Sequence, residues 1–221
     1  MKKISPQEIL NALNIKSIEE VDLTQKLYTN CHEYHVISDE KFLAQNRIVA
    51  NIFSRFPINS ASIAYRKKHS YYDFFKPHLK SEHFLRLDIR SFFHSISPVE
   101  INKSIGSHIA GNSLSENLAF SKRLFDLTCI NSGGKTFLPI GFPSSPHIAN
   151  LVFRPLDIQI QKICSEKNIT YTRYADDMLF SSEDSEVLHS SWFNNRISLT
   201  VSQLSLILNR SKTLKNHLKY H

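Results

Sequence analysis

The sequence predicts an α+β fold in which a small antiparallel sheet carries a group of carboxylates. Two observations support this prediction. Residues 84–89 and 169–182 are apolar and aromatic runs typical of strands, and helix start signals lie between and around them. The chain has 221 residues, 41% of them hydrophobic and 21% charged, which is enough for one or two globular domains with a sizeable core.

Capping signatures mark where helices should begin. Ser5 and Ser97 are each followed by proline and then, three positions after the serine, by glutamate, which is the pattern of a capped helix start. Apolar spacing extends the helical prediction beyond these two starts. The helices expected in the first 130 residues cover 6–20, 40–56, 98–108 and 114–130.

A hairpin and a long helix should follow. Residues 131–135 contain two glycines in a polar stretch, which predicts the tip of a hairpin. Ser145 and Pro146 then form another cap, and apolar residues recur at helical spacing from Ile148 onward. Pro155 lies inside this pattern and should kink the helix, because proline lacks a backbone donor.

The last third of the chain should complete the sheet. Residues 169–182 predict two short strands joined by a turn near Ala175 and Asp176. A helix over 187–203 and a strand over 204–208 are expected to follow. Strands and helices in this order give an α+β domain with a small antiparallel sheet.

Composition restricts the class of protein. The net charge is +7 and the pI is near 9.3, which favours a polyanionic partner, although a basic surface can also serve solubility alone. No stretch is apolar enough for a membrane span or a signal peptide, so no membrane partner is expected. Cys31, Cys129 and Cys164 are too few and too scattered for disulfides or zinc, which predicts a cytoplasmic location.

Carboxylates interrupt both strand-type runs. Asp176 and Asp177 lie in one run and Asp88 lies in the other. An adjacent pair of aspartates is usually part of a solvated turn, but apolar strand residues flank this pair on both sides. Partly buried carboxylates are costly unless a positive charge neutralises them. The pattern therefore predicts a site for two magnesium ions, or manganese in their place, that supports phosphoryl transfer.

Four segments in order carry a resemblance to a known family. They are residues 87–96, 138–150, 171–177 and 208–213, and the third contains a Tyr-x-Asp-Asp motif with a Tyr-Thr-Arg lead-in. These segments resemble the palm motifs of reverse transcriptases, and most of all those of bacterial retron-type and defence-associated enzymes. The resemblance covers roughly residues 30–215.

The resemblance implies a right-hand polymerase fold with fingers and palm. An N-terminal helical segment over 1–30 would precede fingers over 31–86 and a palm over 87–221, with a helical insertion at about 98–130. The chain ends just past the fourth motif. We therefore expect the thumb to be absent from this chain and to come from a protein partner or a missing C-terminal part.

Carried over by position, the resemblance assigns the catalytic centre. Asp88, Asp176 and Asp177 would hold the metal ions, with the backbone carbonyl of Ile89 as a further ligand. Lys212 would orient or protonate the leaving pyrophosphate. The alternative for Lys212 is a solvated lysine at the end of a strand.

The same resemblance assigns the substrate contacts. The backbone amides of Ser91 and Phe92 would face the incoming triphosphate, and Phe93 would be a steric gate that leaves no room for a ribose 2′-hydroxyl. Plain core packing is the alternative for Phe93, because two adjacent rings on a strand point to opposite faces. Ile140 and Gly141 would also lie at the nucleotide. The expected primer and template contacts are Tyr174, Ala175, Pro143 and Ser144.

The function that follows is an RNA-directed DNA polymerase. It would copy an RNA template, a non-coding RNA, into DNA from deoxynucleotide triphosphates in a bacterial retron-like antiviral defence system. Two alternatives stay open. One is a non-catalytic or partner-dependent palm subunit that binds RNA or DNA, since Ile140 replaces the family glutamine and His35 replaces an arginine of the fingers. The other is a template-independent nucleotidyl transferase, or an RNA polymerase, on the same palm.

Overall fold

The computed structural model describes most of the chain, namely residues 3, 5, 25–29, 32–110 and 113–217. The helix expected over 6–20 lies outside these residues. The chain divides into two compact units, of which the first holds Met1–Pro57 and Ile96–Val152 and the second holds Ile58–Ser95 and Phe153–His221. The boundary expected between fingers and palm, after residue 86, falls inside a strand of the second unit. The division into fingers and palm stays a prediction.

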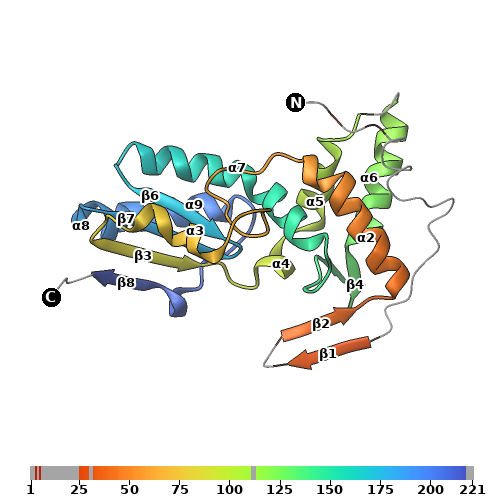
Figure 1. Cartoon of the computed structure of the whole chain (residues 1–221), viewed down its shortest axis with the longest axis horizontal. Helices are drawn as coiled ribbons and strands as arrows, with labels where there is room; N and C mark the ends of the chain where they lie inside the picture. Colours follow the sequence, from red (N-terminus) through yellow and green to blue (C-terminus); the bar gives the residue numbers. More distant parts are fainter. Residues whose placement is uncertain (1–2, 4, 6–24, 30–31, 111–112, 218–221) are drawn as a thin grey trace. The chain divides into compact units, whose positions relative to one another are not determined.

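The first unit combines two short hairpins with helices (Figure 1). Its elements are β1 (Gln25–Thr29), β2 (His32–Val36), α2 (Asp39–Asn51), η1 (Phe53–Arg55), α5 (Pro98–Gly106), α6 (Leu114–Thr128), β4 (Ile130–Ser132), β5 (Lys135–Phe137) and the start of α7 (Ser145–Ser165). The turn expected at 131–135 is confirmed, because Gly133 and Gly134 join β4 to β5 with φ angles of 59° and 73°. Ser97 caps α5 as expected. The β1–β2 hairpin was not expected from the sequence.

The second unit is built on a four-stranded sheet. Its elements are α3 (Tyr71–Phe75), η2 (Lys76–His78), β3 (His83–Asp88), α4 (Phe92–Ser95), the end of α7, β6 (Thr170–Tyr174), β7 (Asp177–Ser182), α8 (Ser185–His189), α9 (Ser191–Ser202), η3 (Arg210–Lys212) and β8 (Leu214–His217). The strand order is β6-β7-β3-β8, and every neighbouring pair is antiparallel. The small antiparallel sheet expected from the sequence is thus confirmed.

The two faces of this sheet pack against different helices. On one face the hydroxyl of Tyr171 donates to Asp157 of α7 over 2.8 Å, and the ring of Phe180 contacts that of Phe193 on α9. On the opposite face Thr172 bonds to the backbone of α3 over 2.8 Å. Successive residues of a strand point to opposite faces, so each side chain of the sheet can be assigned to the α7–α9 face or to the α3 face.

Each unit has its own buried apolar core. In the first unit the fully buried side chains include Ile48, Ile52, Ile101, Ile105 and Leu124. In the second they include Phe74, Leu85, Phe153, Met178, Phe180, Phe193 and Ile197. The cores hold the backbone from which the polar residues of the sheet project.

The helices of the second half match the expectation in part. α7 runs without interruption through Pro155, as one helix of 21 residues. The single helix expected over 187–203 is instead two helices, α8 and α9. They separate at Ser190, whose hydroxyl caps α9 by accepting a hydrogen bond of 3.1 Å from the N–H of Phe193. No helix within the described ranges is both long and apolar enough to cross a membrane.

The strand expected over 204–208 is wrong. Leu204 and Ser205 lie in a turn, with Ser205 in the left-handed region at φ 58°, the next two residues are irregular, and Leu208 makes only an isolated bridge to Ile89. The alternating leucines suggested a strand, but Leu206 is buried next to a turn rather than in a ladder. The edge of the sheet is β8, which pairs with β3 a few residues later in the chain.

Candidate active site

Three aspartates lie at one end of the sheet in the second unit. β3 ends at Asp88 and β7 begins at Asp177, and the antiparallel register places these two residues directly opposite each other on the α3 face. Asp176 precedes Asp177 in the turn from β6, and its carbonyl accepts a hydrogen bond of 3.0 Å from the N–H of Ile89. The structure thus places all four residues expected to be metal ligands at the same end of the sheet, while their role as ligands stays a prediction.

The turn that carries Asp176 is held from inside the protein. Ala175 is buried and has a φ of 55°, a left-handed conformation that costs a residue with a side chain about 1–2 kcal/mol. The guanidinium of Arg173 donates a 2.8 Å hydrogen bond to the carbonyl of Ala175 and pairs with Asp157 of α7 through bonds of 2.9 and 2.7 Å. Arg173 and Asp157 are fully buried. The Tyr-Thr-Arg motif marks Arg173 in the sequence, but no local pattern marks its partner.

The carboxylates perturb one another. Burial raises the pKa of Asp176 above its ordinary value, and the negative charges of Asp88 and then Asp177 raise this pKa further. Asp88 itself is only 6% exposed. Like charges that are close together and partly desolvated attract cations strongly, so the electrostatics of this turn favour a positively charged ligand.

Arg86 is one cation that meets this demand, and it was missed in the sequence. Its Nε and Nη2 donate to the two carboxylate oxygens of Asp177 over 3.0 and 2.5 Å, which is a bidentate ion pair. The pairing with Asp177 raises the pKa of Arg86. Arg86 precedes Asp88 by two positions on β3 and therefore shares its face. That spacing was the available signal.

Lys212, expected to be catalytic, is the second cation. Its Nζ lies 3.2 Å from Oδ2 of Asp88, although the lysine side chain is 63% exposed. η3 brings Lys212 there, because the segment before it runs along the end of β3. The N–H of Asn209 donates to the carbonyl of Asp88 over 2.7 Å. Lys212 therefore lies at the carboxylates, while its exposed side chain also agrees with a solvated lysine, and its catalytic role stays a prediction.

The donor chemistry of this site fits magnesium. Three carboxylates and a backbone carbonyl are hard oxygen ligands of the kind that Mg²⁺ and Mn²⁺ prefer. The described residues nevertheless contain no gathering of three or more His, Cys, Asp or Glu side chains close enough to hold a metal. The ion pairs explain the difference, because Asp177 is turned toward Arg86 and Asp88 toward Lys212.

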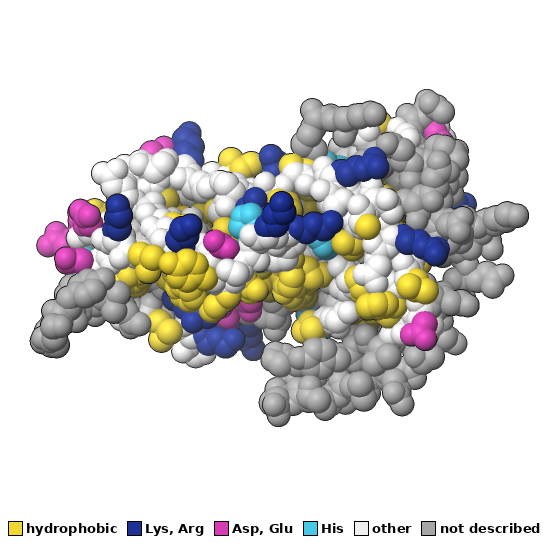
Figure 2. Space-filling view, in the orientation of Figure 1, with side chains coloured by type: hydrophobic (Ala, Val, Ile, Leu, Met, Phe, Trp, Pro, Cys, Tyr) yellow, Lys and Arg dark blue, Asp and Glu magenta, His cyan; other side chains and the backbone are white. Residues whose placement is uncertain are grey.

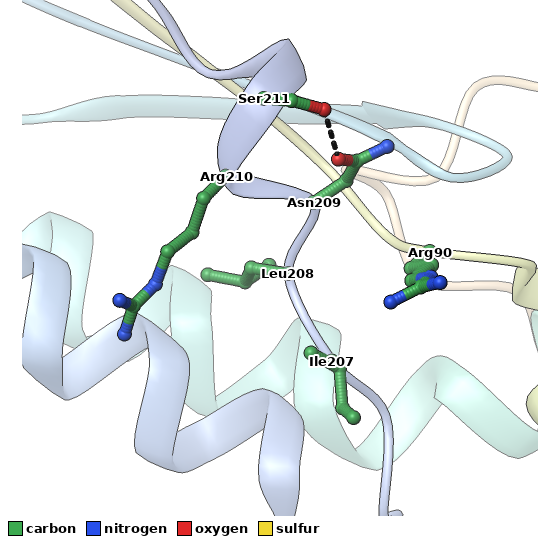
Figure 3. Close-up of a pocket in the computed structure, with 6 residues that line it drawn as sticks. All are labelled: Arg90, Ile207, Leu208, Asn209, Arg210 and Ser211. Atoms are coloured by element: carbon green, nitrogen blue, oxygen red, sulfur yellow. Dashed lines mark hydrogen bonds between the residues drawn. The ribbon is translucent and has the colours of Figure 1, made fainter.

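A cavity opens next to this end of β3. It has a volume of about 680 Å³ and is lined by Arg90, Ile207, Leu208, Asn209, Arg210 and Ser211. Figure 3 shows Arg90 and Arg210 on opposite sides of the 207–209 segment, with Ser211 bonded to Asn209. Both arginines are exposed, so this flank of the candidate site is positively charged.

The expected triphosphate residues follow β3 directly. Ser91 has a φ of 48° and turns the chain into the short helix α4. The expectation that Phe92 and Phe93 point to opposite faces of a strand is wrong, because both lie on α4. Phe92 is buried against Phe153 of α7, with 5.8 Å between ring centres, whereas Phe93 is half-buried. The ring of Phe93 packs against that of Phe92 with 5.5 Å between centres, and its role as the gate stays a prediction.

The residues expected to position nucleotide and template belong to the first unit. Gly141 has a φ of 100°, which a residue with a side chain rarely adopts, and Ile140 and Pro143 flank it at half-buried positions. Ser144 is buried, and its hydroxyl donates a 2.9 Å hydrogen bond to Gln45 of α2. The loop is therefore fixed from within its unit, and Gln45 is a supporting residue that no motif in the sequence indicated.

The expected primer contacts lie in the turn and just before it. Tyr174 ends β6 on the α3 face, and its half-buried ring meets the edge of Tyr71 at 4.8 Å between centres. Ala175 follows in the buried turn described above. Both therefore adjoin Asp176 in the structure, while contact with a primer stays a prediction.

Comparison with known proteins decides the family. The family described as "Reverse transcriptase (RNA-dependent DNA polymerase)" matches residues 29–219. The chain belongs to the reverse transcriptase family. Its relatives include three retron reverse transcriptases of Escherichia coli: Ec83, 33% identical over 59% of this chain; Ec86, 33% identical over 63%; and Ec73, 34% identical over 67%. These relatives support a retron-type bacterial reverse transcriptase.

This reverse transcriptase chain spans less than half the length of those relatives, since the matches cover 42%, 40% and 48% of Ec83, Ec86 and Ec73. Among solved structures, apo telomerase from Candida tropicalis, truncated from its C-terminal domain, matches with a TM-score of 0.50 and 12% identity. That match covers 80% of this chain and 39% of the telomerase chain. At this level of identity the likeness shows the fold alone.

Proposed function

We propose that this chain is the catalytic part of an RNA-directed DNA polymerase. One observation carries the proposal: Asp88 lies directly opposite Asp177 at one end of the sheet, although 88 residues separate them in sequence, and Asp176 lies in the adjoining turn. Membership of the reverse transcriptase family supports it. The substrates would be an RNA template, a primer and deoxynucleotide triphosphates, and the product would be DNA.

We propose that Asp88, Asp176 and Asp177, with the carbonyl of Ile89, hold two divalent ions, Mg²⁺ in the first place. Bound there, such ions activate the attacking hydroxyl and stabilise the leaving pyrophosphate. Other residues of the chain position the aspartates and the nucleotide. Arg173 and Asp157 fix the turn that carries Asp176, and the ring of Phe93 restricts the space for the nucleotide sugar.

Lys212 is proposed to act on the leaving group. Its ammonium lies at Asp88 in the structure, within reach of the carboxylate end of the sheet, and its long exposed side chain can move toward a phosphate. A lysine is three hydrogen-bond donors on a flexible stem and suits either orientation or proton donation. The exposed Arg90 and Arg210 would add positive charge on the same flank.

A second candidate function is a palm that binds nucleic acid without catalysis, or only with a partner. The ion pairs of Arg86 with Asp177 and of Lys212 with Asp88 favour it, because they neutralise two carboxylates without a metal. If the chain is a non-catalytic palm, Mg²⁺ should leave its melting temperature unchanged. If the chain is a polymerase, Mg²⁺ should raise the melting temperature, since a ligand that binds only the folded state stabilises that state.

The retron relatives support a narrower proposal about the template. We propose that it is a non-coding RNA and that the protein works in antiviral defence, both on the resemblance to retron-type enzymes. RNA that is bound to the protein in its host cells, cross-linked, recovered and sequenced, would test the first point. One dominant RNA species is expected, whereas a sample that mirrors total cellular RNA would contradict it.

The test of the activity is extension of a labelled primer on an RNA template with Mg²⁺ and deoxynucleotides. The wild-type chain is compared with Asp176→Asn and with Asp126→Asn, which applies the same change to an exposed aspartate of α6. Extension should persist in the Asp126 variant and disappear in the Asp176 variant. Equal extension by both variants would contradict the assignment of the site, and nucleic-acid binding without extension by any protein would favour the partner-dependent palm.

A further inference from the structure

Aromatic rings gather around Tyr174 at the carboxylate end of β6. The ring of Tyr71 meets Tyr174 edge-on at 4.8 Å between centres, and the ring of Tyr65 lies 6.4 Å away on a tilted plane. Tyr71 also packs against Phe75 at 5.0 Å and against the fully buried Phe74 at 5.7 Å. Tyr65, Tyr71 and Tyr174 are called the tyrosine cluster below.

The tyrosine cluster is presented to solvent although it rests on the core. Tyr65 is 45% exposed and Tyr71 is 46% exposed, so a ligand in solution can reach both rings. The rings of Tyr65 and Tyr71 both contact Tyr174, which only Ala175 separates from Asp176 along the chain. An exposed aromatic surface therefore adjoins the candidate catalytic aspartate.

The loop that carries Tyr65 is rigidly built. Tyr65 and Lys68 have φ angles of 62° and 64°, a conformation that is costly for residues with side chains and persists only where the surroundings enforce it. Arg66 enforces it by donating to the carbonyls of Ser60 and Ser62 over 3.4 and 3.2 Å. Ser62 is in turn bridged to β6. These contacts connect the loop that carries Tyr65 to β6.

The charge beside the tyrosine cluster is positive. Lys67, Lys68 and His69 follow Tyr65 and are exposed, and the next carboxylate along the chain, Asp73, accepts hydrogen bonds from the N–H and the hydroxyl of Ser70. Figure 2 shows hydrophobic side chains gathered over the region where α3 lies in Figure 1, with Lys and Arg side chains next to them. Exposed rings beside lysines suit a single nucleic-acid strand, whose bases stack and whose phosphates need cations.

We propose that the tyrosine cluster, with Tyr65 as its outermost ring, stacks against the terminal nucleotide of the primer strand, and that Lys67 and Lys68 bind phosphates of the same strand. This inference rests on the proposed polymerase function. It names the primer because the strand end nearest Asp176 must be the one whose hydroxyl reacts. Neither the family match nor the motifs assigned Tyr65 or Tyr71 a role.

A photocrosslinking experiment tests the proposal at the level of the residue. A primer with 5-iododeoxyuridine as its 3′-terminal nucleotide is annealed to an RNA template, bound to the protein and irradiated, and the modified peptide is identified by mass spectrometry. The adduct should fall on the peptide that carries Tyr65 and should disappear in Tyr65→Ala. An adduct on that peptide only when the iodinated base is in the template strand would contradict the assignment to the primer.

Binding measurements supply the matched controls. Replacing a stacking aromatic by alanine weakens single-strand contacts by about 5- to 150-fold, so Tyr65→Ala should weaken primer–template binding within this range, measured by fluorescence anisotropy. Tyr65→Phe keeps the ring and should bind as the wild type does. Tyr72→Ala removes a 60% exposed tyrosine of α3 outside the tyrosine cluster and should have no effect. Equal affinity of wild type and Tyr65→Ala would overturn the inference.

The lysines are tested by the dependence of affinity on salt. Each phosphate contact contributes about 0.7 to 0.9 to the slope of log affinity against log salt, so the double variant Lys67→Gln, Lys68→Gln should lower that slope by roughly 1.5. An unchanged slope would remove the lysines from the proposal. If the wild type bound no primer–template at all, the proposed function itself would fail, whereas normal binding by every variant would overturn only this inference.

Discussion

The buried ion pair between Arg173 and Asp157 should be the most sensitive point of the second unit. Both side chains are 0% exposed, and Arg173 also bonds the carbonyl of Ala175 in the turn that carries Asp176. Removing one partner of a buried ion pair leaves the other charge buried without a partner, which lowers the free energy of unfolding by about 3–5 kcal/mol. A chain of this size loses about 2–4 °C of melting temperature per kcal/mol, so Asp157→Asn should lower it by roughly 6–20 °C.

A double variant separates stability from positioning. The double variant combines Asp157→Asn with Arg173→Met, so neither charge of the pair remains in the core. The hydroxyl of Tyr171 can still donate to the asparagine oxygen. Most of the lost stability should therefore return, because neutral replacement of a buried pair is often close to neutral in free energy. The hydrogen bond to Ala175 is still lost in the double variant. Primer extension should consequently stay impaired in a protein that melts almost normally.

The assays are thermal unfolding by circular dichroism and primer extension at a temperature well below every melting point. A melting temperature of Asp157→Asn within about 1 °C of the wild type would refute the reasoning on the buried charge. Full extension by the double variant would refute the claim that Arg173 positions the catalytic turn. The two outcomes are independent, so either part of the reasoning can fail alone.

Three further predictions concern single side chains. Arg86→Gln frees Asp177, so Mg²⁺ should bind a few-fold more tightly and raise the melting temperature more than in the wild type; an equal rise would contradict the ion-pair account. Burial lowers the pKa of His78 from 6.5 to about 4, so between these pH values the unfolded chain binds the proton and the folded chain does not. Stability should therefore fall by about 2 kcal/mol from pH 7 to pH 5, and His78→Gln should flatten this dependence in urea unfolding; an identical slope in the variant would exclude His78 as its source. Phe93→Ala should admit ribonucleotides in single-nucleotide incorporation, and unchanged discrimination against them would remove Phe93 as the gate.

The central part of the fold could be predicted because local patterns specify it. The runs that became β3, β6 and β7 are apolar on both sides of the carboxylates, and the turn at Ala175 lies where the pattern placed it. An antiparallel hairpin then fixes which residues share a face. The meeting of Asp88 with Asp177 therefore follows from strand assignment together with register.

The edge of the sheet could not be predicted in the same way. Residues 204–208 alternate as a strand should, yet the strand at the edge is β8, whose hydrogen bonds come from β3 and not from its own pattern. Pairing with a distant strand overrides local propensity, which is weak for short segments. The break between α8 and α9 was readable, because Ser190 is a good helix cap.

The supporting residues of the site were the hardest to foresee. Arg86 could have been found from its spacing to Asp88, since residues two apart on a strand share a face. Asp157 and Gln45 could not, because each acts on a segment that is distant in the sequence. Motifs identify groups that meet the substrate, whereas the groups that hold them in place depend on tertiary packing.

Incorporation of one nucleotide at a time tests the central claim most directly. A primer annealed to an RNA template of defined sequence is offered each of the four deoxynucleotides separately with Mg²⁺, in the wild-type chain and in Asp176→Asn. We predict that the wild type adds only the nucleotide complementary to the next template base and that Asp176→Asn adds none. Addition that ignores the template base, or that persists in Asp176→Asn, would contradict the account.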